Sequence, residues 1–145
     1  MREARKTNAL ARVAGCAALC VLTLAAVGCG NKVKTCAIEG TVLYNGQPVP
    51  TVDVVFAGED GSRGGSGLTN AEGKFEARFA RGVKGIPKGT YKVYVASQGA
   101  MAPCDARDSL PDFDAVLERY SFKNTPLTYQ VEKTDKEVKF ELSLE

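Results

Sequence analysis

The sequence predicts an all-β fold, a seven-stranded antiparallel β-sandwich preceded by a signal-peptide helix. Three observations predict it. From Cys36 onward, short runs of alternating apolar and polar residues have the period of half-buried strands. Turn residues such as Asn45-Gly46 separate these runs. No convincing long helix interrupts them, and about 100 residues of short strands favour a sandwich.

Glycine-, proline- and asparagine-rich turns separate the expected strands. Asn45-Gly46 predicts a type I′ hairpin turn, because both central positions of that turn need a positive φ. A glycine-rich surface loop is expected over residues 58–67 and two helical turns over 112–119, and the last two strands are expected to form a hairpin around Lys133-Thr134-Asp135. The seven strands are expected over residues 35–43, 52–56, a run that ends at 68–69, 74–79, 90–96, 127–131 and 136–144.

The first 29 residues have the three zones of a secretory signal. Residues 1–12 are basic, residues 13–27 carry no charge, and the small residue Gly28 precedes Cys29. Fifteen uncharged residues are too few to cross a hydrocarbon core of about 30 Å comfortably. The N-terminus therefore predicts a signal peptide that is removed from the mature chain.

The end of this segment, Ala26-Val27-Gly28-Cys29, resembles the lipobox of bacterial lipoproteins. The resemblance implies cleavage between Gly28 and Cys29, a diacylglyceryl group on the Cys29 thiol, and acylation of the new amino terminus by a fatty acid such as palmitate. The residue after Cys29 is Gly30 and not aspartate. By the family's sorting rule, this favours the outer membrane as the destination. The alternatives are an ordinary cleaved signal peptide and an uncleaved single-span anchor.

Three segments are thus expected: the signal peptide over 1–28, a lipidated N-terminus and short linker over 29–35, and the β-sandwich over 36–145. Of the net charge of +2, residues 1–28 supply +3, which leaves −1 for the rest. This mature part has no basic face for phosphate backbones, so no nucleic acid is expected as a partner. The expected partners are the membrane, through the lipid anchor, and an envelope protein or glycan.

The cysteines divide into two groups. Cys16 and Cys20 leave with the signal peptide, and Cys29 is modified by lipid. Cys36 and Cys104 remain in an exported domain, where two leftover cysteines predict one disulfide. The alternative is two separate buried thiols.

Several motifs of the mature chain resemble carboxypeptidase regulatory-like domains. The resemblance implies a prealbumin-like (transthyretin-like) sandwich over residues 36–145. Within it Phe75 and Tyr91 are expected as inward-facing core residues. The motifs are Gly40-Thr41-Val42, Asn45-Gly46-Gln47-Pro48-Val49, Val54-Val55-Phe56, Thr69-Asn70-Ala71-Glu72-Gly73-Lys74-Phe75 and Pro87-Lys88-Gly89-Thr90-Tyr91-Lys92-Val93.

The chain contains no histidine, which removes the proton acceptor of most nucleophilic triads and the usual ligand of catalytic zinc. We therefore expect no enzymatic activity and no cofactor. The expected function is that of a membrane-anchored module with a structural, adhesive or ligand-binding role at the cell envelope. The alternative is a carbohydrate-binding (starch-binding-like) module, whose candidate stacking residues are Tyr44, Tyr94, Tyr120 and Tyr129.

One acidic segment has the oxygen ligands that calcium prefers, but its spacing fits no EF-hand loop. It is expected to be a solvated loop, and no metal site is predicted. Its acidic residues are Asp105, Asp108, Asp112, Asp114 and Glu118.

Overall fold

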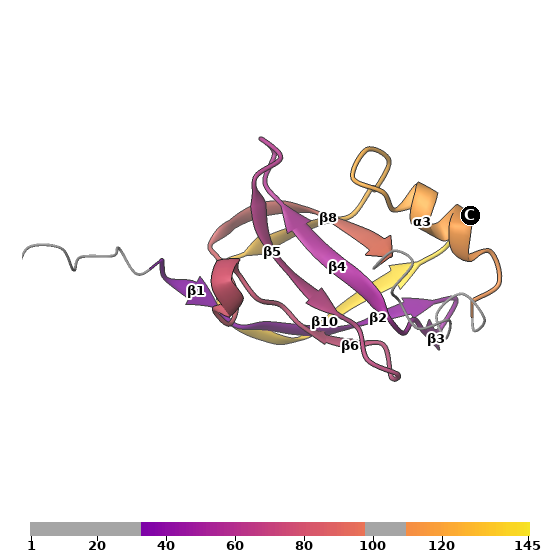
Figure 1. The fold of residues 1–145 in the computed structure, drawn as a ribbon, viewed down its shortest axis with the longest axis horizontal. Coiled ribbons are helices and arrows are strands. Elements are labelled where there is room, and N and C mark those ends of the chain that lie inside the picture. Colours follow the sequence, from indigo (N-terminus) through magenta and orange to yellow (C-terminus); the bar gives the residue numbers. More distant parts are fainter. Residues whose placement is uncertain (1–32, 98–109) are drawn as a thin grey trace, which may run out of the picture. The chain divides into compact units, whose positions relative to one another are not determined.

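The computed structural model describes residues 33–97 and 110–145. These residues belong to one compact unit, Val33–Glu145. The described residues of this unit form an all-β sandwich with one short α-helix, as the sequence predicts (Figure 1). No helix in the described ranges has the length and apolar character needed to cross a bilayer.

The order of the elements follows the predicted succession of strands and turns. The bounds are β1 (Thr35–Cys36), β2 (Ile38–Tyr44), β3 (Gln47–Pro48), β4 (Val52–Ala57), β5 (Arg63–Leu68), β6 (Lys74–Glu76), the 3₁₀ turn η2 (Ala80–Gly82), β7 (Ile86–Pro87), β8 (Gly89–Ser97), α3 (Phe113–Arg119), β9 (Thr128–Val131) and β10 (Asp135–Leu142).

Two four-stranded sheets form the sandwich. In the first, β2 pairs with β10 on one edge and with both β3 and β6 on the other. The second has the order β5-β4-β8-β9, with every pair antiparallel. The short strands β1 and β7 form a separate antiparallel pair. Both sheets turn alternate side chains inward, so the apolar positions of each strand share one core.

Phe56 lies at the centre of that core and is fully buried. Four aromatic rings surround it at centroid distances of 6.1 to 6.5 Å, in tilted or edge-on arrangements. They come from both sheets: Phe75, Tyr91, Tyr129 and Phe140. The burial of Phe75 and Tyr91 confirms their prediction as core residues.

The two sheets join along one side, where β5 meets the chain that continues β6. The Ser66 amide donates to the Arg78 carbonyl at 2.9 Å, and the Arg78 amide donates to the Ser66 carbonyl at 2.8 Å. Glycine makes this approach possible: a Cβ on Gly67 would lie only 2.7 Å from the Glu76 carbonyl oxygen. We call this junction the β5–β6 seam.

Two predicted turns have the expected geometry. Asn45 and Gly46 adopt φ angles of 50° and 79° between the paired residues Tyr44 and Gln47, which confirms the type I′ hairpin. In the second turn the Asn70 side-chain oxygen accepts hydrogen bonds from the amides of Glu72 and Lys74. The expected helical turns also occur, as α3.

The hairpin expected between the last two strands is wrong. β9 pairs with β8 in the second sheet, whereas β10 crosses to the first sheet and pairs with β2 in parallel, so the sandwich is not antiparallel throughout. Alternation could not reveal this crossing, because Val131 of β9 and Val138 of β10 both point into the shared core, whichever sheet they belong to. The expected loop over 58–67 is also shorter, since β5 begins at Arg63.

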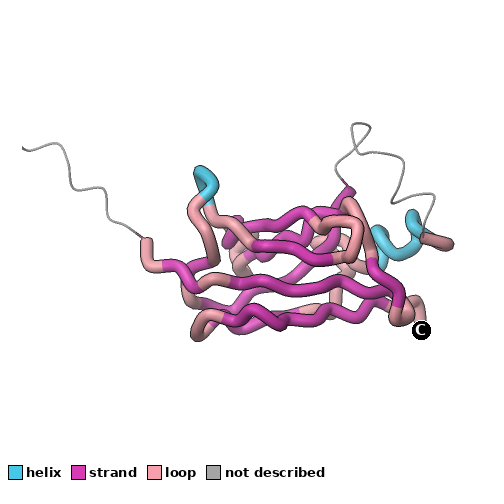
Figure 2. Tube along the Cα trace, turned by 90° about the horizontal axis from the view of Figure 1, so that it is seen from below, coloured by secondary structure: helices cyan, strands magenta, loops and turns pink. Residues whose placement is uncertain are grey.

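The described unit has two distinct ends (Figure 2). One end, which we call the β1 end, contains β1, β7, η2 and the turn over residues 132–134. Their proximity follows from the pairing of Cys36 with Ile86 and from the hydrogen bond of the Asp135 amide to the Ala37 carbonyl. The opposite end, the α3 end, contains α3 and the C-terminus (Figure 1).

Candidate functional site

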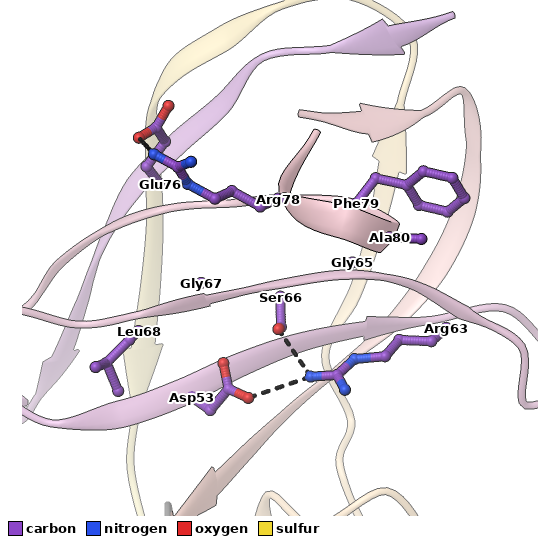
Figure 3. A pocket seen from close by; sticks show the side chains of 11 residues that line it. Asp53, Arg63, Gly65, Ser66, Gly67, Leu68, Glu76, Arg78, Phe79 and Ala80 are labelled. Atoms are coloured by element: carbon purple, nitrogen blue, oxygen red, sulfur yellow. Dashed lines mark hydrogen bonds and ion pairs between the residues drawn. The ribbon is translucent and has the colours of Figure 1, made fainter. Parts of the chain in front are cut away.

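A shallow depression of about 660 Å³ lies beside the β5–β6 seam (Figure 3). Strand β5 forms its floor, where Gly65 and Gly67 present backbone in place of side chains. Charged side chains stand on both sides of this floor, and Leu68 and Phe79 add apolar surface. The full lining is Asp53, Arg63, Gly65, Ser66, Gly67, Leu68, Glu76, Arg78, Phe79, Ala80 and Gly82.

On one side of the depression, Arg63 bridges two neighbouring strands. Its guanidinium lies 3.3 Å from the Asp53 carboxylate and donates a hydrogen bond of 2.8 Å to Ser66 Oγ. Burial raises the pKa of Asp53 above its ordinary value of 3.8, and Arg63 and Ser66 oppose that rise only in part. The Asp53 carboxylate is therefore held in an environment that disfavours its charge.

On the other side of the depression, Glu76 forms ion pairs with two basic side chains. Its carboxylate lies 3.0 Å from the Arg78 guanidinium and 2.8 Å from the Lys84 ammonium. The hydrogen bond from Lys84, followed by that from Arg78, lowers the pKa of Glu76 below 4.5. Glu76 is thus fully ionised at neutral pH.

This arrangement offers charged and hydroxyl groups for polar recognition. Ser66 has a carboxylate and a guanidinium as neighbours but no imidazole to accept its proton, because the chain contains no histidine. The charged side chains of the depression form ion pairs with one another. A charged ligand would therefore have to replace one partner of such a pair. Among the described residues, no group of three or more acidic or cysteine side chains is placed to bind a metal ion.

The predicted lipidation and cleavage residues, Gly28 and Cys29, lie outside the described residues. The same is true of Cys104, the predicted partner of Cys36. Cys36 itself is buried beside β7, with 9% of its surface exposed. The disulfide therefore stays a prediction.

The tyrosines considered for sugar stacking pack against other side chains, three of them in or beside the core and Tyr94 on the outer face of β8. Tyr44 and Tyr120 are buried, and the half-buried Tyr94 stands edge-on to Phe122 at 5.6 Å. Tyr129 is wedged between Phe56 and Phe140 at about 6 Å from each ring. None of these rings, all of them in the described part of the chain, is exposed as a stacking platform.

The acidic segment is only partly described. Asp105 and Asp108 lie outside the described residues. Asp112 precedes α3, and Asp114 and Glu118 lie within it; all three are exposed to solvent. The described part brings no further acidic ligand to them.

The depression at the seam was not predicted from the sequence. Alternation over residues 52–56 places Asp53 on the outer face of its strand. This placement is the one feature of the sequence that points to the depression. Its partner could not be found, because Arg63 and Ser66 fall in a glycine-rich run that is typical of a loop and that here forms β5. Glycines are normally depleted in strands, and this strand uses them to approach β6.

No protein-family model matches the chain, and neither does any curated protein. Among solved structures, the major pilin subunit of Bacillus cereus, BcpA, is similar with a TM-score of 0.34 and 14% identity. The similarity covers 76% of this chain and 29% of that pilin, so the chain spans less than a third of its length. A likeness of this degree carries no argument about function.

Proposed function

We propose that this protein is a lipid-anchored envelope protein, in which acyl chains on Cys29 hold a non-catalytic β-sandwich at the membrane surface. One observation carries the proposal. The compact unit begins at Val33, only four residues after Cys29. Cleavage before Cys29 would therefore remove the basic and uncharged segments and leave every described strand in place.

A tether of this length has a physical consequence. From Cys29 to the first strand residue, Thr35, the chain can extend about 20 Å at most. Two or three acyl chains bind a bilayer stably, whereas a single chain binds only marginally. The sandwich would thus stay close to the lipid surface without any membrane-spanning helix.

The interior of the described domain supports a binding or structural role over catalysis. Every buried side-chain nitrogen or oxygen in the described ranges has a hydrogen-bond partner. The shifted pKa values have structural causes: burial for Asp53, and ion pairs for Glu76. Enzymes commonly keep such groups unpaired and poised near neutral pH.

Lipidation is tested by fractionation of cells that produce the full chain. Wild-type protein should partition with membranes, and globomycin should cause a larger, lipidated precursor to accumulate. The Cys29→Ser variant should lose the lipid and leave the membrane fraction once its leader is cleaved, whereas Cys16→Ser should behave as wild type. Membrane partitioning of a mature Cys29→Ser protein would overturn the proposal.

Carbohydrate binding remains the alternative for the module itself. The depression supports it with the carboxylate and guanidinium of Asp53 and Arg63, groups that bind sugar hydroxyls. The packed tyrosines weigh against it, because sugar rings usually need an exposed aromatic face. A glycan array probed with the exported domain distinguishes the two: an Arg63-dependent signal supports the alternative, and silence removes it.

A further inference from the structure

We propose that the β1 end of the sandwich lies against anionic lipid headgroups of the membrane that holds the anchor. This inference rests on the proposed lipidation of Cys29. It adds an orientation and a ligand class: the end of the domain that faces the bilayer, and the phosphate-bearing lipids that it contacts.

Four lysines gather at the β1 end. Their placement follows from backbone contacts: the Thr35 hydroxyl donates to the Lys84 carbonyl at 2.7 Å, and Thr35 pairs with Pro87, the residue before Lys88. Lys133 lines the same shallow depression as Lys88. All four side chains are exposed: Lys34, Lys84, Lys88 and Lys133.

The β1 end also carries carboxylates, which stay ionised but have contacts other than Lys34 and Lys88. Asp135 accepts hydrogen bonds from the Tyr129 hydroxyl and the Glu137 amide, although Lys133 also acts on it electrostatically. Glu132 accepts a hydrogen bond of 2.9 Å from the Gln130 side chain. Within the described ranges no ion pair joins Lys34 or Lys88 to a carboxylate. These two ammonium groups are available to an external anion.

Glu76 is the exception, because it binds Lys84 at 2.8 Å. This ion pair is exposed, with 70% of the Lys84 side chain accessible to solvent, and such pairs contribute little free energy. Lys84 can therefore exchange Glu76 for a lipid phosphate at small cost.

The opposite end of the domain is richer in acidic residues. Five exposed carboxylates lie there beside the exposed basic residues Arg119 and Lys123. An anionic surface attracts the lysines of the β1 end and repels the carboxylates of the α3 end. The acidic residues of the α3 end are Asp112, Asp114, Glu118, Glu141 and Glu145.

The β1 end also exposes apolar side chains at its tip. Val33 is 52% exposed and Val83 is 47% exposed, and both stand next to lysines of the cluster. Apolar side chains beside basic ones suit the headgroup region, where the stem of lysine can also bury against lipid.

The short tether brings this cluster within range. At most about 20 Å of chain separates Cys29 from Thr35, so the shortest stretch of chain from the anchor leads to the β1 end. Exposed charges act over about 8 to 10 Å at physiological salt. Each lysine near an anionic leaflet should change the population of the contact state about fivefold.

The test uses the lipidated full-length product, reconstituted in phosphatidylcholine vesicles with or without phosphatidylglycerol. Lysine acylation followed by mass spectrometry reports the accessibility of each side chain. With phosphatidylglycerol, Lys34, Lys88 and Lys133 should react severalfold more slowly, and high salt should reverse the protection. Lys74 and Lys123, exposed away from this end, should react at the same rate in both vesicles. Equal rates for all five lysines would overturn the proposal.

A charge-reversal pair provides the matched control. The Lys88→Glu/Lys133→Glu variant should lose the protection of Lys34, whereas Lys74→Glu/Lys123→Glu should keep it. The mass of the same sample shows whether Cys29 carries lipid, so failure of the anchor is distinguished from failure of the orientation. If the mature chain carries no lipid, co-sedimentation of that chain with the two vesicle types at low salt tests the lipid contact alone. Binding that is equal for both vesicle types contradicts it.

Discussion

The Tyr120 hydroxyl binds both backbone polar groups of Ser143. It donates to the Ser143 carbonyl at 3.1 Å and accepts from the Ser143 amide at 2.9 Å. Next to it, Arg119 donates to the Glu145 carbonyl at 2.8 Å. The end of α3 is thus joined to the chain that leaves β10, so the helix and the C-terminus form one structural unit.

Removal of this hydroxyl should destabilise the domain. Tyr120→Phe leaves the buried ring in place but deprives two backbone groups of their partner, and we expect a loss of about 1 to 2 kcal/mol in the free energy of unfolding. Chemical denaturation measures it. Tyr94→Phe is the control, because the Tyr94 hydroxyl has no hydrogen bond within the described residues. Equal effects of the two substitutions would argue against the Tyr120–Ser143 contact.

The ionised carboxylate of Asp53 should lower the free energy of unfolding at neutral pH. Its pKa is higher in the folded state than its ordinary 3.8, so the folded state favours the protonated form. The resulting stabilisation is complete below pH 3.8 and is lost as the pH rises through the folded pKa. The free energy of unfolding of Asp53→Asn, relative to that of wild type, should therefore be higher at pH 7 than at pH 3. Denaturant unfolding at the two pH values checks this, and a variant that is relatively worse at pH 7 would contradict it.

Asp135 should have the opposite dependence on pH. The Glu137 amide, followed by the Tyr129 hydroxyl, lowers its folded pKa below 3.8. The stability that it contributes is present above pH 3.8 and is lost as the pH falls through the folded value. The penalty of Asp135→Asn, measured by unfolding across this range, should thus be present at pH 7 and shrink in acid. A penalty independent of pH would show that the charge of Asp135 is not responsible.

The same pair of residues predicts an alkaline titration. Burial, reinforced by the neighbouring Asp135 carboxylate, raises the pKa of Tyr129 to about 12. Burial also raises the pKa of Tyr91, so spectroscopic titration should show late-titrating tyrosines in wild type, and Tyr129→Phe should remove the step near pH 12. In Asp135→Asn this step should move to lower pH yet stay above 10, because burial persists. A wild-type titration that is complete near pH 10 would contradict the packing of Tyr129.

Gly67 should be intolerant of a side chain at the β5–β6 seam. In Gly67→Ala the added Cβ would lie 2.7 Å from the Glu76 carbonyl and 3.1 Å from the Phe75 ring, so the two strands must separate. We expect the free energy of unfolding to fall by about 1 to 3 kcal/mol, as it does at other overpacked sites. Leu68→Ala, at the neighbouring exposed position, should cost about 0.5 kcal/mol or less. Thermal unfolding of the two variants compares them directly.

Local features of the fold could be predicted because their causes are local. The Asn45-Gly46 turn needs two positive φ angles, and Phe75 and Tyr91 lie on the inner face of alternating runs. The parallel pairing of β10 with β2 could not be predicted in the same way. The alternation of Val138 and Phe140 specifies which side chains point inward, but not which sheet carries them.

The candidate site was missed for a related reason. A strand with glycine at positions 64, 65 and 67 has the local composition of a loop, and it becomes a strand only because β4 and the chain after β6 pair with it. Tertiary contacts therefore decide both the seam and the depression beside it.

The central claim is that lipid on Cys29, immediately before the sandwich, attaches this protein to a membrane. Intact-mass spectrometry of the protein extracted from membranes tests it most directly. We expect a mature chain that begins at Cys29 and carries the added mass of a diacylglyceryl group. The same spectrum reports whether Cys36 and Cys104 have lost two hydrogens to a disulfide. A mature chain that begins at another residue, or that carries an unmodified Cys29, would contradict the claim.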